Sequence, residues 1–269
     1  MPRFLLRIEY AGTRYRGWQI QNNARTVQGE IARAARDVLR TDNFELYGSG
    51  RTDAGVHAIE QVAHLDTAAK IAPARLADEI NAILPADINI LSVETVDRRF
   101  HARHSATSRS YLYQIARRRT AFAKPYVWWV REPLDVARMR DAAAVFTGMH
   151  DFRAFSDDDP DEKSTKVLVE SLTVEEEGSL VLVRITGSHF IWKMVRRVVG
   201  ILVEAGQGRL SRRDIERMLG FGGSGVPSAR DAEAVARLTA PASGLFLEKV
   251  TYEGRDQVQA TRMGMKASL

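Results

Sequence analysis

The order in which apolar patterns follow one another along the first hundred residues constrains the fold of this chain most strongly. Alternating or aromatic and β-branched residues favour strands, while apolar residues three and four apart favour amphipathic helices. The segments that favour strands are 4–10, 43–47, 59–65 and 88–96, and those that favour helices are 27–40 and 73–84. The resulting β-α-β-β-α-β order is the split βαβ arrangement of ferredoxin-like folds, with helices on one face of an antiparallel sheet.

The second half of the chain repeats this order without a detectable sequence repeat. Its expected elements are a strand over 109–116, a helix over 134–147, a hairpin of 168–175 and 180–186, helices over 190–205 and 212–219, and a strand over 245–252. We therefore predict an α+β protein of two ferredoxin-like or RRM-like halves, with a largely antiparallel sheet and an active-site cleft between the halves. The predicted domains are 1–104 and 105–253, followed by a flexible tail over 254–269.

A glycine-framed loop, Gly48–Ala58, joins two of the predicted strands and carries a single carboxylate, Asp53. Gly48, Gly50 and Gly55 permit positive φ and allow a ligand to approach the backbone closely. An aspartate in such a loop often only forms a turn. The same position at the rim of a sheet also suits a carboxylate that performs covalent chemistry.

The charge distribution points to a polyanion as partner. The net charge is +5, and residues 98–119 contain seven arginines and no acidic residue. A second arginine cluster lies over 196–217, while 157–162 is acidic and is expected to form an exposed loop turned away from a nucleic acid. Phosphate binding on the basic side accounts for this polarity, and a solvated face with scattered ion pairs is the alternative.

Composition excludes several classes of protein. The absence of cysteine excludes disulfides and thiolate zinc sites, and the six histidines do not have the spacing of metal ligands. No apolar run approaches about twenty residues, and the first residues lead directly into a predicted strand without the apolar stretch of a signal peptide. We expect a cytoplasmic protein with no membrane segment.

Several motifs together resemble one family of RNA-modifying enzymes. The segment Gly50-Arg-Thr-Asp-Ala-Gly-Val-His-Ala58 resembles the signature of the tRNA pseudouridine synthase A family. The resemblance extends to other segments: Ile8–Gln21, Thr26–Gln28, Phe100–Arg103, Ser105–Thr107, His150–Phe152, Phe190, Met194–Arg196, Gly200 and Ala240–Leu245. Departures are Ala11, where an acidic residue is usual, and His189, Trp192 and Lys193.

The resemblance implies that Asp53 is the catalytic nucleophile of a uridine isomerase. The carboxylate could attack C1′ of the ribose or C6 of the base, or could assist glycal formation by abstracting the C2′ proton, and the sequence does not choose among these routes. A carboxylate in a desolvated pocket needs a cation nearby to remain ionised. The resemblance assigns that role to Arg196, which helical periodicity places outside the polar stripe of Lys193, Arg197, Gly200 and Glu204. A snorkelling arginine is the alternative.

Three further residues are candidates for substrate binding. Tyr111 matches the family's active-site tyrosine, whose ring can stack on a flipped uracil, although strand alternation places Tyr113 on the same face and a core tyrosine is the alternative. Arg51 is expected to contact phosphate or to fill the space left by the extruded base, or else to brace the loop through an ion pair. Leu245 is expected to shield the carboxylate from water, and His57 to order the loop.

The expected activity is isomerisation of uridine to pseudouridine in the anticodon stem-loop of tRNA, at tRNA positions 38–40, by a homodimer without cofactor or metal. A non-catalytic RNA-binding protein with the same sheet surfaces is the first alternative. A glycosyl hydrolase is the second, and it would need an acid-acting carboxylate near Asp53 that the loop does not supply.

Overall fold

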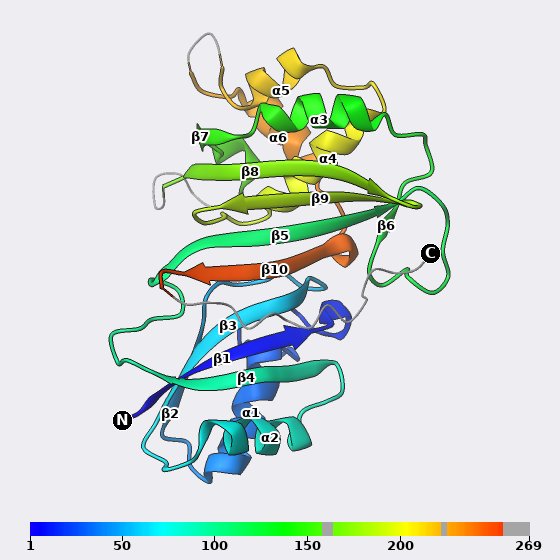
Figure 1. Cartoon of the computed structure of the whole chain (residues 1–269). Coiled ribbons are helices and arrows are strands. Elements are labelled where there is room, and N and C mark those ends of the chain that lie inside the picture. The colour runs from blue at the N-terminus through cyan, green and yellow to red at the C-terminus, as the bar shows by residue number, and fades with distance from the viewer. Residues whose placement is uncertain (158–163, 222–224, 255–269) are drawn as a thin grey trace. The chain divides into compact units, whose positions relative to one another are not determined.

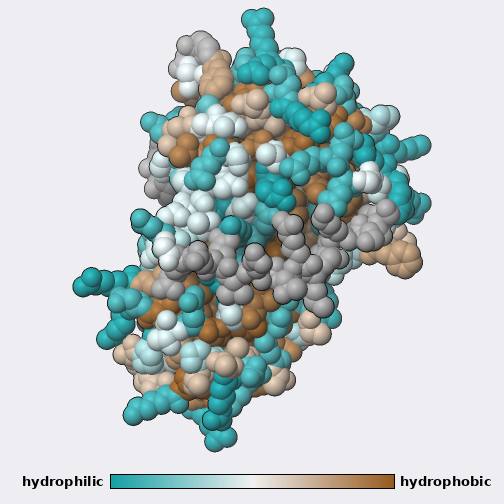
Figure 2. Space-filling model, in the orientation of Figure 1, coloured by the Kyte–Doolittle hydropathy of each residue, from teal (hydrophilic) through white to brown (hydrophobic). Residues whose placement is uncertain are grey.

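The computed structural model describes residues 1–157, 164–221 and 225–254, and it confirms the α+β class. The chain forms two compact units (Figure 1). Of the described residues, the first comprises 1–107 and 246–254, and the second comprises those within 108–245. Hydrophilic side chains project from the surface seen in Figure 2 around smaller hydrophobic areas. None of the helices in the described ranges is long and apolar enough to span a bilayer.

The first unit has the predicted β-α-β-β-α-β order. Its elements are β1 (Arg3–Tyr10), α1 (Val27–Leu39), β2 (Phe44–Gly48), β3 (His57–Thr67), α2 (Pro73–Ile83), β4 (Ile88–Val96) and most of β10 (Leu245–Tyr252). Strand β1 pairs antiparallel with β3 on one side and with β4 on the other. Along its second edge β3 pairs antiparallel with β2 and parallel with β10.

Local sequence signals set the helix boundaries of the first unit. The Thr26 hydroxyl accepts a hydrogen bond from the Gly29 backbone at the start of α1, and Pro73 begins α2, where a missing amide hydrogen costs nothing. Helix α1 buries Ile31 and Ala34, and α2 buries Leu76. These apolar stripes pack within a core that includes the fully buried residues of β1. Burial of each leucine or isoleucine side chain in this core contributes about 1.5–3 kcal/mol.

The second unit is built on an antiparallel sheet of different connectivity. Its elements are β5 (Ala106–Ala116), β6 (Trp128–Trp129), α3 (Val136–Ala144), β7 (Gly148–Asp151), β8 (Lys166–Glu177), β9 (Leu180–Gly187), α4 (Met194–Gly206), α5 (Arg212–Met218) and α6 (Ala229–Arg237). The antiparallel pairs are β5 with β9, β9 with β8 and β8 with β7, while β6 pairs parallel with β5.

The division of the chain corrects the predicted domains in two ways. The boundary falls between residues 107 and 108 rather than at 104, and the residues from Phe246 group with the first unit instead of completing the second half. Strand β10 pairs with β3 through Phe246 and Leu247, and the other strands of the first unit precede it by more than a hundred residues. Alternation in a sequence indicates a strand but does not tell which sheet edge it joins.

Other differences have local causes. Helix α4 begins at Met194 instead of residue 190, because Lys193 adopts a left-handed conformation with φ of 63° that interrupts helical geometry. Helix α6 and the short strands β6 and β7 lacked a pattern long enough to predict them. The predicted flexible tail over 254–269 lies outside the described residues except for Gly254.

Candidate active site

The loop that carries Asp53 is anchored by hydrogen bonds to strand β1 and to the residues that follow it. The Thr52 hydroxyl bonds to the Tyr10 hydroxyl at 2.8 Å, and the Thr52 carbonyl accepts a hydrogen bond from the Trp18 backbone at 3.1 Å. The Gly55 backbone donates to the Tyr15 carbonyl at 3.3 Å. These bonds fix the backbone on both sides of Asp53, whose side chain is half-buried. A carboxylate fixed in this way is oriented before any substrate arrives.

The structure requires glycine at two of the three glycine positions of this loop. Gly55 has φ of 81° in a turn closed by a hydrogen bond from the Val56 backbone to the Asp53 carbonyl, a position that favours glycine. Gly48 has no positive φ, but a Cβ there would lie 2.6 Å from the Trp18 indole. Gly50 has neither a positive φ nor a close neighbour, since a Cβ there would meet no atom within 4 Å. The expectation of positive φ therefore holds for Gly55 and is wrong for Gly48 and Gly50.

The N-terminal segment approaches the loop so closely that two of its own residues must be glycine. A Cβ on Gly17, which has φ of 91°, would lie 2.5 Å from the Thr52 carbonyl oxygen. A Cβ on Gly12 would lie 1.9 Å from the Val56 carbonyl oxygen. The Gly12 backbone donates to Nδ1 of the buried His57 at 3.0 Å, so His57 orders the loop as an acceptor. Sequence reasoning assigned no role to Gly12, Gly17 or Trp18, although all three lie in a segment that carries the family resemblance.

Arg51 lies exposed on this loop, two residues before Asp53. Among the residues that the structure describes, no acidic side chain forms an ion pair with it. The geometry therefore lacks the bracing ion pair that was the alternative role for Arg51. A guanidinium in this position is available to a phosphate group.

In the second unit, Arg196 is clamped to the segment that ends at Leu245. The Arg196 Nε donates to the Ala240 carbonyl oxygen at 2.7 Å, and the Ala240 backbone donates to the Arg196 carbonyl oxygen at 3.1 Å. Helix α4 can approach this segment because Gly200 lies against it, where a Cβ would come 1.6 Å from the Leu238 carbonyl oxygen. The two motifs at 194–196 and 240–245, distant in sequence, are thus brought together.

The predicted polar stripe of α4 is wrong in one important respect. Arg197 is only 3% exposed and forms an ion pair with Asp157, which also accepts a 2.5 Å hydrogen bond from Lys193. Burial raises the pKa of the Asp157 carboxyl, but these hydrogen bonds and charges outweigh it, so that the pKa lies below its ordinary value. Asp157 therefore supports the start of α4, while the rest of the expected acidic loop, residues 158–162, lies outside the described part.

The structure separates the two tyrosines that strand alternation could not distinguish. Tyr113 is fully buried, and its hydroxyl donates to the Pro241 carbonyl oxygen at 2.7 Å. Burial raises the pKa of Tyr113 above its ordinary value, an effect that the charge of Arg196 partly offsets. Tyr111 is half-buried and packs edge-on against Phe190, with ring centroids 5.2 Å apart. Tyr113 is thus a core residue that holds the segment after Ala240, while Tyr111 keeps part of its ring accessible.

Leu245 is 5% exposed and follows the short 3-10 helix Ala242–Gly244. Its aliphatic side chain can exclude water from a neighbouring polar group. Among residues 1–157, 164–221 and 225–254, no group of three or more histidine, aspartate or glutamate side chains has an arrangement that could hold a metal ion.

Comparisons with known proteins agree on one class, enzymes that modify RNA by isomerising uridine. A family model described as tRNA pseudouridine synthase matches residues 7–105 and 142–253. The chain is 41% identical over 257 residues to tRNA pseudouridine synthase A of Nitrobacter winogradskyi, a match that covers 94% of this chain and 97% of the relative. It is 36% identical over 252 residues to tRNA pseudouridine synthase A of Aquifex aeolicus, covering 93% and 99% of the two chains.

The chain therefore belongs to the tRNA pseudouridine synthase family, whose members are isomerases that act on tRNA. A solved structure, that of a Cbf5-Nop10-Gar1 complex, matches with a TM-score of 0.37 and 12% identity over 76% of this chain and 45% of that chain. This likeness is too weak to support an argument about the site.

Proposed function

We propose that this protein isomerises uridine to pseudouridine in the anticodon stem-loop of tRNA, at tRNA positions 38–40, with Asp53 as its catalytic nucleophile. The observation that carries the proposal is the placement of Asp53. Its half-buried carboxylate lies on a turn that hydrogen bonds to Trp18 and Tyr15 immobilise, in a motif that matches the family signature.

The reaction needs no external reactant, which suits a site made only of side chains. The bond between N1 of uracil and C1′ of the ribose breaks, the base turns, a bond forms between C5 and C1′, and the C5 proton leaves while N1 gains one. A carboxylate can serve as nucleophile toward C1′ or C6, or as the base that removes the C2′ proton in a glycal route. The proposal leaves these three routes open.

Four other side chains complete the proposal. We assign Arg196 as the cation that keeps Asp53 ionised, because it matches the arginine of the family motif and Ala240 fixes its side chain. Tyr111 would stack on the flipped uracil and help to remove the C5 proton, and Leu245 would shield the carboxylate. Arg51 would contact the RNA backbone, since it is exposed on the same loop.

Substitution of Asp53 tests the proposal. Asp53→Asn keeps the shape of the side chain but removes its nucleophilicity, so we expect pseudouridine formation to fall below detection while tRNA affinity changes little. Tritium release from tRNA labelled at C5 of uridine measures the isomerisation, and mapping of pseudouridine identifies the positions. Asp37→Asn, on the exposed side of α1, is the matched control and should retain full activity.

Retained turnover in Asp53→Asn would refute the assignment of the nucleophile. Tight tRNA binding by the wild-type protein without isomerisation would instead favour a non-catalytic RNA-binding protein. The proposal also includes a cytoplasmic location and a homodimer in which each subunit helps to hold the tRNA served by the other, and sedimentation of the protein tests the dimer.

A further inference from the structure

Four aromatic rings form a continuous cluster at the end of the first unit where β2 and β3 pair. Tyr47 stacks on His64 with ring centroids 5.3 Å apart and an interplanar angle of 21°. His101 contacts both, at 5.9 Å from Tyr47 and 4.7 Å from His64, and His104 extends the row at 4.4 Å from His101. We call these residues the ring cluster. Tyr47 is 48% exposed and His104 is also exposed, so the cluster presents aromatic surface to solvent.

Backbone hydrogen bonds fix the two inner histidines of the cluster. The Ala102 backbone donates to Nδ1 of His64 at 3.2 Å, and the Arg103 backbone donates to Nδ1 of His101 at 3.1 Å. Burial lowers the pKa of His64 to about 4, and it also lowers the pKa of His101. Both rings are therefore neutral at pH 7, and His64 supports the Tyr47 ring from beneath without adding charge.

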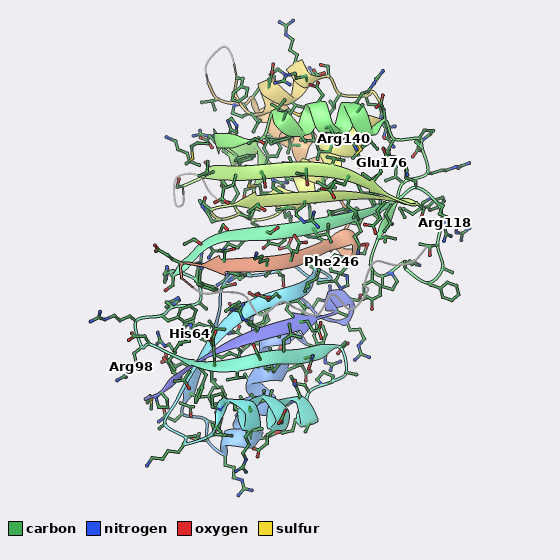
Figure 3. All side chains as sticks on the ribbon, in the orientation of Figure 1. His64, Arg98, Arg118, Arg140, Glu176 and Phe246 are labelled. Carbon is green, nitrogen blue, oxygen red and sulfur yellow. The ribbon has the colours of Figure 1, made fainter. Side chains whose placement is uncertain are left out.

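Two exposed arginines precede His101 and His104 in the loop that supplies these two rings. Arg98 and Arg99 are exposed, and neither forms an ion pair with an acidic side chain in the described part of the chain. The Arg3 guanidinium donates to the carbonyl oxygens of Arg98 and Phe100, at 2.9 and 2.5 Å, and so shapes the loop that carries these arginines. Figure 3 shows His64 and Arg98 at the same end of the first unit.

We propose that the ring cluster is a second RNA-binding site, at which an unpaired base of the tRNA stacks on Tyr47 while Arg98 and Arg99 contact the adjacent phosphates. Exposed aromatic rings beside unpaired guanidinium groups are the combination that binds single-stranded nucleotides in RNA-recognition sheets. Two exposed arginines that form no ion pair with a described acidic side chain add little to the stability of the fold, whereas a polyanion with a planar base can use both the guanidinium groups and the exposed tyrosine ring.

Tyr47 directly precedes the loop that carries Asp53, but the ring cluster lies toward the opposite end of β3 from His57. A strand rises about 3.3 Å per residue, and His64 comes seven residues after His57, so these two residues lie about 23 Å apart along β3. Tyr47 comes six residues before Asp53, which limits their separation to about 20 Å, or roughly six stacked nucleotides at about 3.4 Å each. The base bound here is therefore a different nucleotide from the uridine that is isomerised. The inference rests on the proposed function for the identity of the RNA.

The test compares variants of Tyr47 by their equilibrium affinity for an unmodified tRNA transcript. Tyr47→Leu keeps apolar contact with His64 but removes the aromatic ring, and base stacking contributes about 1–3 kcal/mol, so Kd should rise by about 5- to 150-fold. KM should rise in parallel while kcat at saturating tRNA stays unchanged. Tyr47→Phe keeps the ring and should bind like the wild type. Phe122→Leu, which alters a 94% exposed aromatic residue of the second unit, is the matched control.

The arginines give an independent readout. Arg98→Gln and Arg99→Gln should each reduce the slope of log Kd against log salt by about 1, because each removes one phosphate contact. Wild-type affinity in Tyr47→Leu, or equal losses in Tyr47→Leu and Tyr47→Phe, would overturn the proposal, as would an unchanged salt slope in both arginine variants. Affinity does not depend on turnover, so these results stand apart from the fate of Asp53→Asn. Thermal melting of each variant confirms that the first unit remains folded.

Discussion

Removal of the Tyr113 hydroxyl is the most informative perturbation of the second unit. The hydroxyl donates at 2.7 Å to the Pro241 carbonyl oxygen, and Tyr113 is fully buried. In Tyr113→Phe the Pro241 carbonyl loses this donor, and because Pro241 is exposed, water can replace it, so the cost is that of one net hydrogen bond, about 0.5–1.5 kcal/mol of unfolding free energy. For a unit of this size that corresponds to a decrease in Tm of roughly 1–6 °C.

The same substitution should also affect catalysis through Arg196. Pro241 follows Ala240, whose carbonyl oxygen holds the Arg196 Nε at 2.7 Å. Loss of the Tyr113 bond loosens this segment, so the guanidinium loses its fixed position, and we expect kcat/KM for tRNA to fall by about tenfold or more, mostly in kcat. Differential scanning calorimetry and tritium release measure the two effects.

Tyr252→Phe is a matched control for this experiment. The Tyr252 hydroxyl donates to the Ala102 carbonyl oxygen, also at 2.7 Å, and Tyr252 is 5% exposed in the first unit. Because the Ala102 acceptor is buried, Tyr252→Phe should lose at least as much stability but retain activity at a temperature where both variants are folded. Equal losses of activity in the two variants, or an unchanged Tm in Tyr113→Phe, would refute the reasoning.

Two further predictions concern the loop that carries Asp53 and the dependence of stability on pH. Gly17→Ala places a Cβ 2.5 Å from the Thr52 carbonyl oxygen at a residue with positive φ, so it should lower the free energy of unfolding by at least about 1–2 kcal/mol and remove most of the activity. Gly50→Ala meets no atom within 4 Å and should behave like the wild type. Urea unfolding and turnover assays measure both variants. Hydrogen bonds from Ser211 and Arg217 lower the pKa of Asp214 from 3.8 to about 2 in the folded state. The stability that Asp214 contributes is therefore fully present above about pH 5 and is lost as pH falls toward 2. The urea midpoints of the wild type and Asp214→Ala should converge over that range. A constant difference between the two midpoints would contradict the assignment.

Local patterns predicted most of the elements and the chemistry-bearing motifs. The strands of the first unit and helices α1 and α2 were predicted to within a few residues, because alternation and helical spacing act over short distances. Asp53 and Arg51 could be singled out because Gly48–Ala58 is a contiguous signature. The shift of the α4 boundary to Met194 depended on the backbone of one residue, Lys193, which no periodicity reveals.

Burial of charge was decided by tertiary contacts. Arg197 and Arg196 are adjacent, yet Arg197 is buried against Asp157 while Arg196 is half-buried against Ala240. A helical projection shows only the direction of a side chain around the helix axis. It cannot show that Asp157, forty residues before Arg197, supplies a carboxylate to the face that was predicted to be solvent-exposed. Tyr111 and Tyr113 differ for the same reason, because strand alternation assigns a face but not what covers it.

The sequence by itself determined the α+β class, the order of elements and the single carboxylate of the loop, since these follow from short-range spacing and residue chemistry. Only the tertiary structure showed that β10 pairs with β3 and that Gly12 and Gly17 pack closely against the backbone of the loop that carries Asp53. The contacts of the Tyr47 ring with His64 and His101 were likewise visible only in the tertiary structure. These are contacts between residues far apart in the chain, and their geometry depends on how whole strands and loops pack rather than on any local pattern.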